Sequence, residues 1–450
     1  MRNESMTVSA NYDAIAKCNK CGFCHVACPI FRATGHESGV ARGRLALLRG
    51  IIEERIEWND ELEDPLFTCL GCGACTTNCF GSVPTADLIL NARAEYFDNV
   101  GKKPAHRLLF EHLLPHPKRL HLAARTAALG KNSGASKLAN ALGLLRIFGR
   151  DLPKAEGIVE KLPMTSFRGT VTPQTYEGEG ASLRIGYFVG CGVDVIQVDT
   201  GKATFESLKK IGKSVTVLNN CCCGLPPWSY GDIDNTKVLA EKNLKTFAEA
   251  EVDVIVTDCS SCASFLKDYK KVFADEPAKL ELIDKTRSKI KDVVEFLYSS
   301  KFGNREDKDK ELVDSYHDAH AGTEAVQKVV SQSDKVVVTY HDPCHAVRGQ
   351  GIKSESRELL QSLANVEFRE MAESDWCCGG AGSYALSHYD LSQKVLDRKI
   401  NNLEKTEADI LVTSCPACMI QLAWGIRKHG LKTKIFHISE MTAYKESIGA

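Results

Sequence analysis

The segment VDVIVTDCSSC (residues 252–262) recurs later in the chain as ADILVTSCPAC (residues 408–418). In each copy, a run of β-branched and aliphatic residues of strand length leads directly into a C-x-x-C pair. A segment that returns at a fixed distance is typical of an internal duplication. The sequence therefore predicts two related modules, each with a strand that ends at a pair of thiols.

The duplication extends to the other cysteines of this part of the chain. The first set is Cys191, CCCG at 221–224 and CSSC at 259–262, and the second is Cys344, CCGG at 377–380 and CPAC at 415–418. Corresponding cysteines lie 153–156 residues apart. Each module thus has five matching cysteines, and Cys221 is the additional one.

A strand-like run precedes each of these cysteine groups, and amphipathic helical stretches lie between the groups. This alternation favours α/β modules on parallel sheets, in which ligands bind beyond the carboxyl ends of the strands. Three loops in each module should therefore bring five thiols to one crevice. Cys259 and Cys415 should open helices, where the positive end of the helix dipole favours thiolates.

The N-terminal part carries two further cysteine runs, CNKCGFCHVACP (18–29) and CLGCGACTTNCF (69–80). Both have the spacing C-x2-C-x2-C-x3-C, which is typical of bacterial ferredoxins with two cubane [4Fe–4S] clusters. In this pattern the fourth cysteine of each run ligates the other cluster. One predicted site is Cys18, Cys21, Cys24 and Cys79, and the other is Cys69, Cys72, Cys75 and Cys28. Zinc is the alternative, but it needs only four thiolates in a C-x2-C plus C-x2-C layout.

The bulk composition agrees with metal or redox chemistry. The chain has 450 residues and 19 cysteines, and an odd count argues against a fully paired disulfide framework. The first residues, MRNESMTVSANYDA, have no apolar core, and no run approaches the ~18 apolar residues of a membrane span. We therefore expect a cytoplasmic protein whose cysteines bind metal. A peripheral position on the inner face of the membrane is the alternative location.

Residues 101–150 hold ten Lys or Arg residues and a single acidic one, Glu111. Leu, Phe and Ile recur among them at helical spacing, and Pro115 and Pro117 should divide the segment into two helices. One interpretation is a pair of connecting helices with a solvated basic face. The other is a cationic amphipathic surface for anionic lipid or an acidic partner subunit. No motif supports a nucleic-acid partner.

Two resemblances follow from these motifs. The tandem ferredoxin runs, with the helical segment VARGRLALLRGIIEERI (40–56) between them, resemble the α-helical ferredoxin domain of succinate dehydrogenase-type iron–sulfur subunits. The repeated cysteine set resembles the cysteine-rich CCG domain of heterodisulfide reductase catalytic subunits. That family implies a noncubane [4Fe–4S] cluster in each module, with zinc, cubane clusters or a decayed half as alternatives. The implied ligands are Cys191, Cys222, Cys223, Cys259 and Cys262 in the first module, and Cys344, Cys377, Cys378, Cys415 and Cys418 in the second.

The order of motifs along the whole chain resembles the iron–sulfur subunits of glycolate or D-lactate oxidase (dehydrogenase) complexes. The stretches YHDPCHAVRGQGI (340–352) and CCGGAGSYALSHYDLSQKVLDRKI (377–400) resemble this group most. The resemblance implies an electron-transfer subunit that works with an FAD-containing hydroxy-acid oxidase and passes electrons to a quinone or another acceptor. No G-x-G-x-x-G follows a strand in this chain, so hydride chemistry should belong to the partner. A disulfide reductase of the heterodisulfide type is the second hypothesis, and an iron–sulfur protein without turnover is the third.

The expected fold class is α/β with an N-terminal all-α ferredoxin-like domain and duplicated CCG modules on parallel sheets. The expected domains are a ferredoxin domain at 1–100, a basic connector and linker at 101–182, and CCG modules at 183–310 and 311–450. Alignment on the glycine after each cysteine group pairs Cys222 with Cys377 and Cys223 with Cys378. Cys221 then matches Trp376, so we expect Cys221 to be the thiol that does not bind metal, although a register shifted by one residue remains open.

Overall fold

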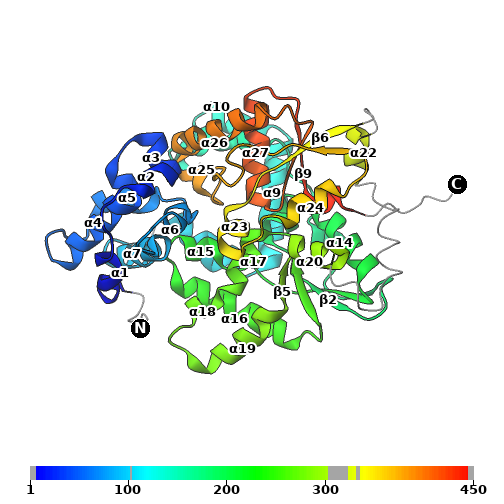
Figure 1. The fold of residues 1–450 in the computed structure, drawn as a ribbon, viewed down its shortest axis with the longest axis horizontal. Helices are drawn as coiled ribbons and strands as arrows, with labels where there is room; N and C mark the ends of the chain where they lie inside the picture. The colour runs from blue at the N-terminus through cyan, green and yellow to red at the C-terminus, as the bar shows by residue number, and fades with distance from the viewer. Residues whose placement is uncertain (1–6, 102–103, 303–322, 331–334, 444–450) are drawn as a thin grey trace.

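The structure, a computed structural model, describes residues 7–101, 104–302, 323–330 and 335–443. The N-terminal helices form one end of the molecule, and two α/β modules form the larger part beside them (Figure 1). This arrangement confirms the predicted fold class, a helical N-terminal region followed by duplicated α/β modules.

The N-terminal region is built from short helices around the two ferredoxin-like loops. The predicted helix between the loops is present as α4, whose Leu48 packs with Leu66 and Leu88 in a buried core. Pro29 at the first position of α3 and left-handed glycines before α2 and α6 set where these helices begin. The helices are α1 (Tyr12–Ala16), α2 (Phe23–Ala27), α3 (Pro29–Thr34), α4 (Ala41–Ile52), α5 (Glu63–Phe67), α6 (Ala74–Thr77) and α7 (Thr85–Asn99).

The basic segment forms connecting helices, and its prolines divide it as predicted. A π-helical turn ends before Pro115, and Pro117 occupies the first turn of the next helix. The elements are α8 (Pro104–Arg107), η5 (Leu108–Leu113), α9 (Pro117–Asn132), α10 (Ala135–Ala141), η6 (Leu144–Phe148) and α11 (Leu152–Ala155). In the segment 163–182, the structure has a short helix, α12 (Phe167–Thr170), and a strand, β1 (Thr175–Glu177).

The two modules share one sheet topology, which is the structural form of the duplication. The first sheet has the order β1-β3-β2-β4-β5 and the second β7-β6-β8-β9, so the last four strands of the first match the second. All pairings are parallel except that of β1 with β3. The further strands are β2 (Arg184–Tyr187), β3 (Ser214–Val217), β4 (Val254–Thr257), β5 (Ile290–Asp292), β6 (Val336–Tyr340), β7 (Val366–Phe368), β8 (Ile410–Thr413) and β9 (Lys434–His437).

The helices of the modules connect these strands and cover the sheets. In the first module they are α13 (Cys191–Val195), α14 (Val198–Ile211), α15 (Leu225–Ser229), α16 (Ile233–Glu249), α17 (Ser260–Lys267), α18 (Tyr269–Val272), α19 (Pro277–Lys289) and α20 (Val293–Phe302). In the second they are α22 (Glu324–Val330), α23 (Cys344–Gln350), α24 (Glu355–Gln361), α25 (Tyr384–Ser387), α26 (Tyr389–Glu404), α27 (Pro416–Lys428) and α28 (Ile438–Met441).

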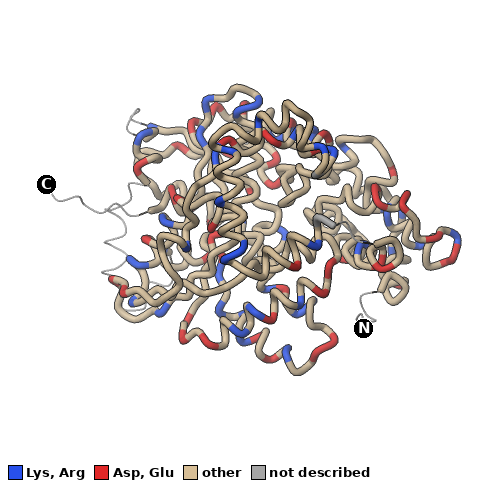
Figure 2. Tube along the Cα trace, turned by 180° about the vertical axis from the view of Figure 1, so that it is seen from behind, with Lys and Arg blue, Asp and Glu red and all other residues tan. Residues whose placement is uncertain are grey.

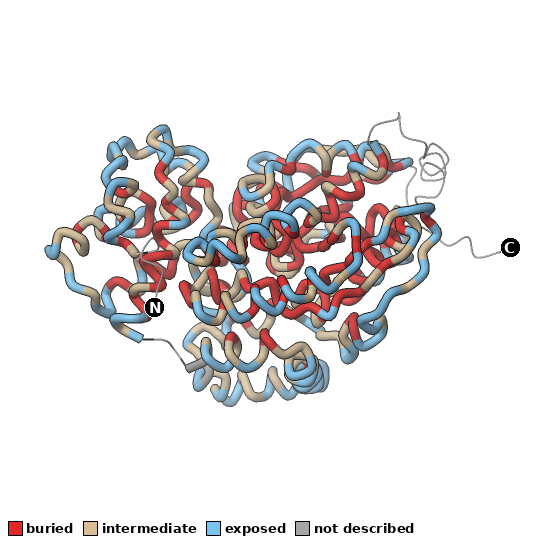
Figure 3. Tube along the Cα trace, turned by 90° about the horizontal axis from the view of Figure 1, so that it is seen from below, coloured by how far each residue is buried: buried red, intermediate tan, exposed pale blue. Residues whose placement is uncertain are grey.

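One apolar core runs through both modules. It includes Tyr187 and Val256 of the first sheet and Tyr340 and Val412 of the second, all fully buried. Figure 3 shows the buried residues concentrated inside the modules, with exposed residues along the outer helices. The modules are therefore packed as one body, and the expected boundary between residues 310 and 311 lies outside the described residues.

Candidate metal centres

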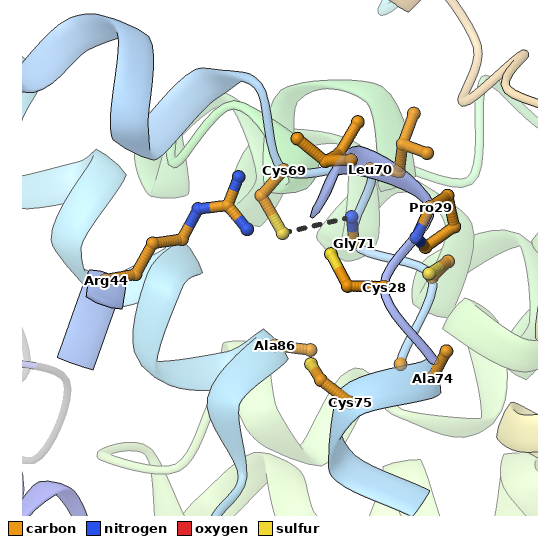
Figure 4. A pocket seen from close by; sticks show the side chains of 12 residues that line it. Cys28, Pro29, Arg44, Cys69, Leu70, Gly71, Ala74, Cys75 and Ala86 are labelled. Atoms are coloured by element: carbon orange, nitrogen blue, oxygen red, sulfur yellow. Dashed lines mark hydrogen bonds between the residues drawn. The ribbon is translucent and has the colours of Figure 1, made fainter. Parts of the chain in front are cut away.

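The second ferredoxin-like loop forms a pocket that gathers four cysteines from two distant segments. Cys69, Cys72 and Cys75 line it together with Cys28, which comes from the first loop (Figure 4). Cys75 lies in α6, and the amide of Gly71 donates a hydrogen bond to the Cys69 sulfur at 3.5 Å. The exchange of the fourth cysteine between loops, expected from the spacing, is what the structure places here.

The pocket of the first loop is lined by Cys18, Cys21 and Cys24 with Cys79 of the second loop. Cys75 lines this pocket as well, so the two pockets share a wall. Cys21 is exposed at the molecular surface. The structure thus brings both predicted N-terminal sets together and sets them side by side.

Charge and burial act in opposite directions on the thiols of the second-loop pocket. Burial opposes ionisation of the Cys69 thiol, but the positive charges of Arg44 and Arg93 hold its pKa below the ordinary value. Burial raises the pKa of Cys75 well above the usual range, and the neighbouring thiols Cys69 and Cys72 raise it further. Four crowded thiols can become thiolates together only if a cation joins them, so this donor set fits a metal cluster.

In the first module, three loops at the carboxyl ends of the strands converge as predicted. Cys191 begins α13 after β2, Cys222 and Cys223 follow β3, and the pair Cys259 and Cys262 follows β4. Cys259 is the N-cap residue of α17, which confirms the expected helix start. The Cys191 and Cys222 sulfurs are 3.8 Å apart, and hydrogen bonds from Cys222 and Cys262 lower the pKa of Cys223 to about 5.

The second module repeats this arrangement. Cys344 begins α23, Cys415 is the N-cap residue of α27, and the Cys378 and Cys418 sulfurs are 3.5 Å apart. Hydrogen bonds from Cys377 and Cys418 hold the pKa of Cys378 well below its usual range. In both modules one thiol is thus poised as a thiolate among protonated neighbours, the state from which a metal displaces the remaining protons.

The extra cysteine of the first module points away from its site. The Cys221 sulfur lies 3.5 Å from the carbonyl oxygen of Leu239 and 3.4 Å from Oδ1 of Asn243, both in α16. Cys222 and Cys223 instead contact the other cysteines of the set. The geometry supports the register aligned on the glycine.

Two thiol contacts join neighbouring sites, and no pattern in the sequence predicts them. Cys72 of the ferredoxin-like domain contacts Cys377 of the second module. Cys415 of the second module contacts Cys259 of the first. Ser261 lies at this second junction, with its hydroxyl 3.3 Å from the Cys415 sulfur and 3.1 Å from Nδ1 of His345. The four cysteine sets therefore form a continuous row.

Helix α9 of the connector is fixed to the first module through a buried ion pair. His121 lies 2.6 Å from a carboxylate oxygen of Asp194, which also pairs with Arg168 at 2.7 Å. Burial opposes ionisation of Asp194, but the His121 hydrogen bond and the Arg168 charge hold its pKa below the ordinary value. Spacing gave no sign of this contact because its members lie far apart in the chain.

The outward side of the connector is both apolar and basic. Leu122 is 68% exposed and Ile147 is 79% exposed. Lys and Arg residues are spread along α9 on the face seen in Figure 2. The exposed members of this surface, the connector face, are Lys118, Arg119, Leu122, Arg125, Leu129, Lys137, Leu138, Leu142, Leu144, Arg146, Ile147 and Arg150. Among the described residues, no helix has the length and apolar character needed to cross a membrane.

Comparison with known families covers each part of the chain. A 4Fe-4S dicluster domain matches residues 14–83, and a cysteine-rich domain matches residues 185–267 and 338–423. The linker region of the glycolate oxidase iron-sulfur subunit matches residues 101–159. The matches follow the order of the observed helices and modules.

Similar curated proteins include one that matches nearly end to end. The chain is 29% identical over 442 residues to the probable glycolate oxidase iron-sulfur subunit of Bacillus subtilis (strain 168), covering 95% of this chain and 93% of that protein. It is 30% identical over 267 residues to a subunit of the fumarate reductase (CoM/CoB) of Methanothermobacter marburgensis, covering 59% and 47%. It is 28% identical over 262 residues to lactate utilization protein A of Bacillus cytotoxicus, covering 58% and 98%.

Proposed function

Because the chain belongs to the glycolate oxidase iron–sulfur subunit family, we propose that it receives electrons from an FAD-containing partner that oxidises glycolate or D-lactate. It delivers them to a quinone or another acceptor. Oxidation of a 2-hydroxy acid releases two electrons, and iron–sulfur clusters supply the chemistry for moving them one at a time. The observation that carries the proposal is the continuous row of four cysteine sites.

The proposed ligands follow from the four sets that the fold gathers. The first two sites hold cubane clusters, and the two modules hold further [4Fe–4S] clusters of the noncubane type. The ligands are Cys18, Cys21, Cys24 and Cys79; Cys69, Cys72, Cys75 and Cys28; Cys191, Cys222, Cys223, Cys259 and Cys262; and Cys344, Cys377, Cys378, Cys415 and Cys418. Five thiols in a module exceed what a zinc site uses.

The row of sites gives an order of transfer that differs from the order along the chain. Cys75 lines both N-terminal pockets, Cys72 contacts Cys377, and Cys415 contacts Cys259. An electron that enters at the exposed Cys21 end therefore reaches the second module before the first. On this proposal the electron donor docks at the ferredoxin-like end.

The test uses the complex purified anaerobically with its flavoprotein. Glycolate or D-lactate should reduce an artificial dye, and Cys69→Ser should abolish this activity because it removes a proposed ligand. Cys221→Ser is the matched control, since it makes the same chemical change at a thiol that faces α16. A complex that reduces the dye with neither acid, or that keeps full activity in Cys69→Ser, would contradict the proposal.

A disulfide reductase is the second candidate function, and one observation favours it. The five-thiol sites of the two modules adjoin through Cys259 and Cys415, with His345 hydrogen-bonded to Ser261 at the junction. Two adjacent redox centres suit a substrate that is cleaved into two thiols by two electrons. Turnover of a disulfide by the chain with reduced methyl viologen, without response to hydroxy acids, would favour this candidate over the first.

We propose that the connector face rests on anionic lipid and brings the complex to a membrane-bound acceptor. Exposed Leu122 and Leu129 alternate with Lys118 and Arg125 along α9, which is the pattern of a cationic interfacial helix. The connector helices themselves carry the exposed leucines, while His121 fixes α9 to the first module. A rigid amphipathic face of this kind binds lipid without spanning the bilayer.

Vesicle flotation tests this surface. The full chain should float with phosphatidylglycerol vesicles and not with phosphatidylcholine vesicles, and the double variant Leu122→Ser, Leu129→Ser should float at least tenfold less. Val238→Ser is the matched control, because Val238 is an exposed aliphatic residue of α16 outside the connector face. Equal flotation of wild type and double variant would refute the lipid contact, and binding to an acidic protein surface instead would assign the face to a partner subunit.

A further inference from the structure

The buried histidine His341 has a polar ring without a conventional partner. It follows directly after β6, is 1% exposed, and neither ring nitrogen has, among the described residues, a hydrogen-bond partner that meets the distance and angle limits. An unsatisfied buried donor costs roughly 1–3 kcal/mol, so buried polar groups in proteins nearly always find a partner. His341 therefore points to an interaction that the protein atoms alone do not supply.

The surroundings of the ring show where that interaction would lie. A ring nitrogen of His341 and the sulfurs of Cys378 and Cys418 all lie within 4.8 Å of one another. Both cysteines belong to the five-thiol set of the second module, and their sulfurs are 3.5 Å apart. The imidazole is thus directed at the sulfur-lined side of this set.

The duplicated module provides an internal comparison. The cysteines at 191 and 344 correspond, so the position three residues earlier is Phe188 in the first module and His341 in the second. Phe188 is fully buried and packs against Phe247 with the ring centroids 5.9 Å apart. A phenyl ring offers no N–H donor. The two sites, which share five matching cysteines, therefore differ at this position in what they offer a cluster.

We propose that an N–H of His341 donates a hydrogen bond to the Cys378 thiolate of the cluster in the second module and raises the reduction potential of that cluster above that of the first. The proposal rests on the presence of a cluster in each module. Hydrogen bonds to cluster sulfurs raise reduction potentials because they stabilise the added negative charge of the reduced state. His341 is a positioning and tuning residue, and its five neighbouring cysteines remain the ligands.

The order of sites gives this difference a role. Cys377 of the second module contacts Cys72 of the ferredoxin-like domain, so the second module is the one adjacent to the N-terminal clusters. A higher potential there favours transfer out of the ferredoxin-like domain. Onward movement to the first module then requires a second electron or a bound acceptor, which holds electrons near the junction of the modules.

The experiment is a redox titration monitored by electron paramagnetic resonance on the full chain, purified anaerobically, with iron counted in parallel. His341→Phe copies the first module. It should keep the wild-type iron content and shift the midpoint potential of a single centre downwards, while His341→Gln, which retains an N–H donor, should shift it less. Tyr340→Phe is the matched control, since it alters an equally buried neighbour on β6 and should leave all potentials unchanged.

The outcomes separate this inference from the proposed function. A wild-type count of about eight irons would remove the clusters of the modules and with them the basis of the inference. A count of about sixteen with unchanged potentials in His341→Phe would overturn the inference alone. A loss of about four irons in both His341 variants would also overturn it, because His341 would then be required for binding rather than tuning. Protein carrying isotopically labelled histidine should show a nitrogen coupling to the shifted centre that His341→Phe abolishes.

Discussion

Replacement of Cys221 by alanine should leave iron binding intact, whereas replacement of its neighbour Cys222 should not. Both thiols are buried and stand side by side in one loop, so the two variants remove the same atom from the same part of the core. Only Cys222 contacts the other cysteines of its site, with its sulfur 3.8 Å from that of Cys191. The pair of variants therefore isolates metal binding from packing.

The cost in stability can be worked from the contacts of Cys221. Removal of one buried heavy atom costs about 1 kcal/mol, and loss of the weak S–H interactions with Leu239 and Asn243 adds about 0.5 kcal/mol. The backbone amide of Cys221 still donates to Oδ1 of Asn243 at 3.1 Å in the variant. Cys221→Ala should thus fold, bind about sixteen irons and unfold with a free energy reduced by about 1–2 kcal/mol.

Cys222→Ala should lose about four irons per chain, measured by iron analysis of anaerobically purified protein. Guanidinium unfolding of the iron-free chains should show similar free energies for the two variants, because the packing change is the same. If Cys221→Ala loses the four irons and Cys222→Ala retains them, the register aligned on the glycine is wrong and the ligand set shifts by one residue.

Three further predictions concern buried charges. Arg93 donates hydrogen bonds to the carbonyls of Leu66 and Cys69, so Arg93→Met should lower the free energy of unfolding by about 2–4 kcal/mol, with Arg93→Lys intermediate, in a chemical denaturation series. The depressed pKa of Asp194 gives stability that is present above the unfolded value of about 3.9 and lost as the pH falls, and Asp194→Asn should remove this acid slope from unfolding curves. Burial raises the pKa of Glu440 to about 7, so its contribution is present below about pH 4.3 and lost as the pH rises through 7; Glu440→Gln should flatten unfolding curves across that interval.

Local patterns in the sequence were enough to predict the modules. The strand-like runs before Cys191, Cys259, Cys344 and Cys415 all became strands, because β-branched residues in a buried parallel sheet agree with their local preference. Short outer elements escaped prediction. β5 has three residues and β9 four, too few for a periodic pattern to emerge.

The relations between sites needed the tertiary structure. The spacing of the ferredoxin-like loops predicted that Cys28 joins Cys69, but no pattern predicted that Cys72 would lie against Cys377, about 300 residues away. That contact depends on how α6 packs beside α23. The contrast between His341 and Phe188 is visible once the two copies are aligned, yet its meaning comes from burial and from the absence of another partner for the imidazole in the described structure.

Burial of the cysteines increases from one end of the row to the other. Cys21 is exposed, whereas Cys222, Cys223, Cys259 and Cys262 of the first module are buried. Oxidants attack accessible thiolates first, so molecular oxygen and peroxide should damage the surface site long before they reach the interior. Such damage disconnects the chain from its electron supply while the deeper sites stay intact. Recovery after oxidative stress would then require iron to be restored only where repair proteins can reach it.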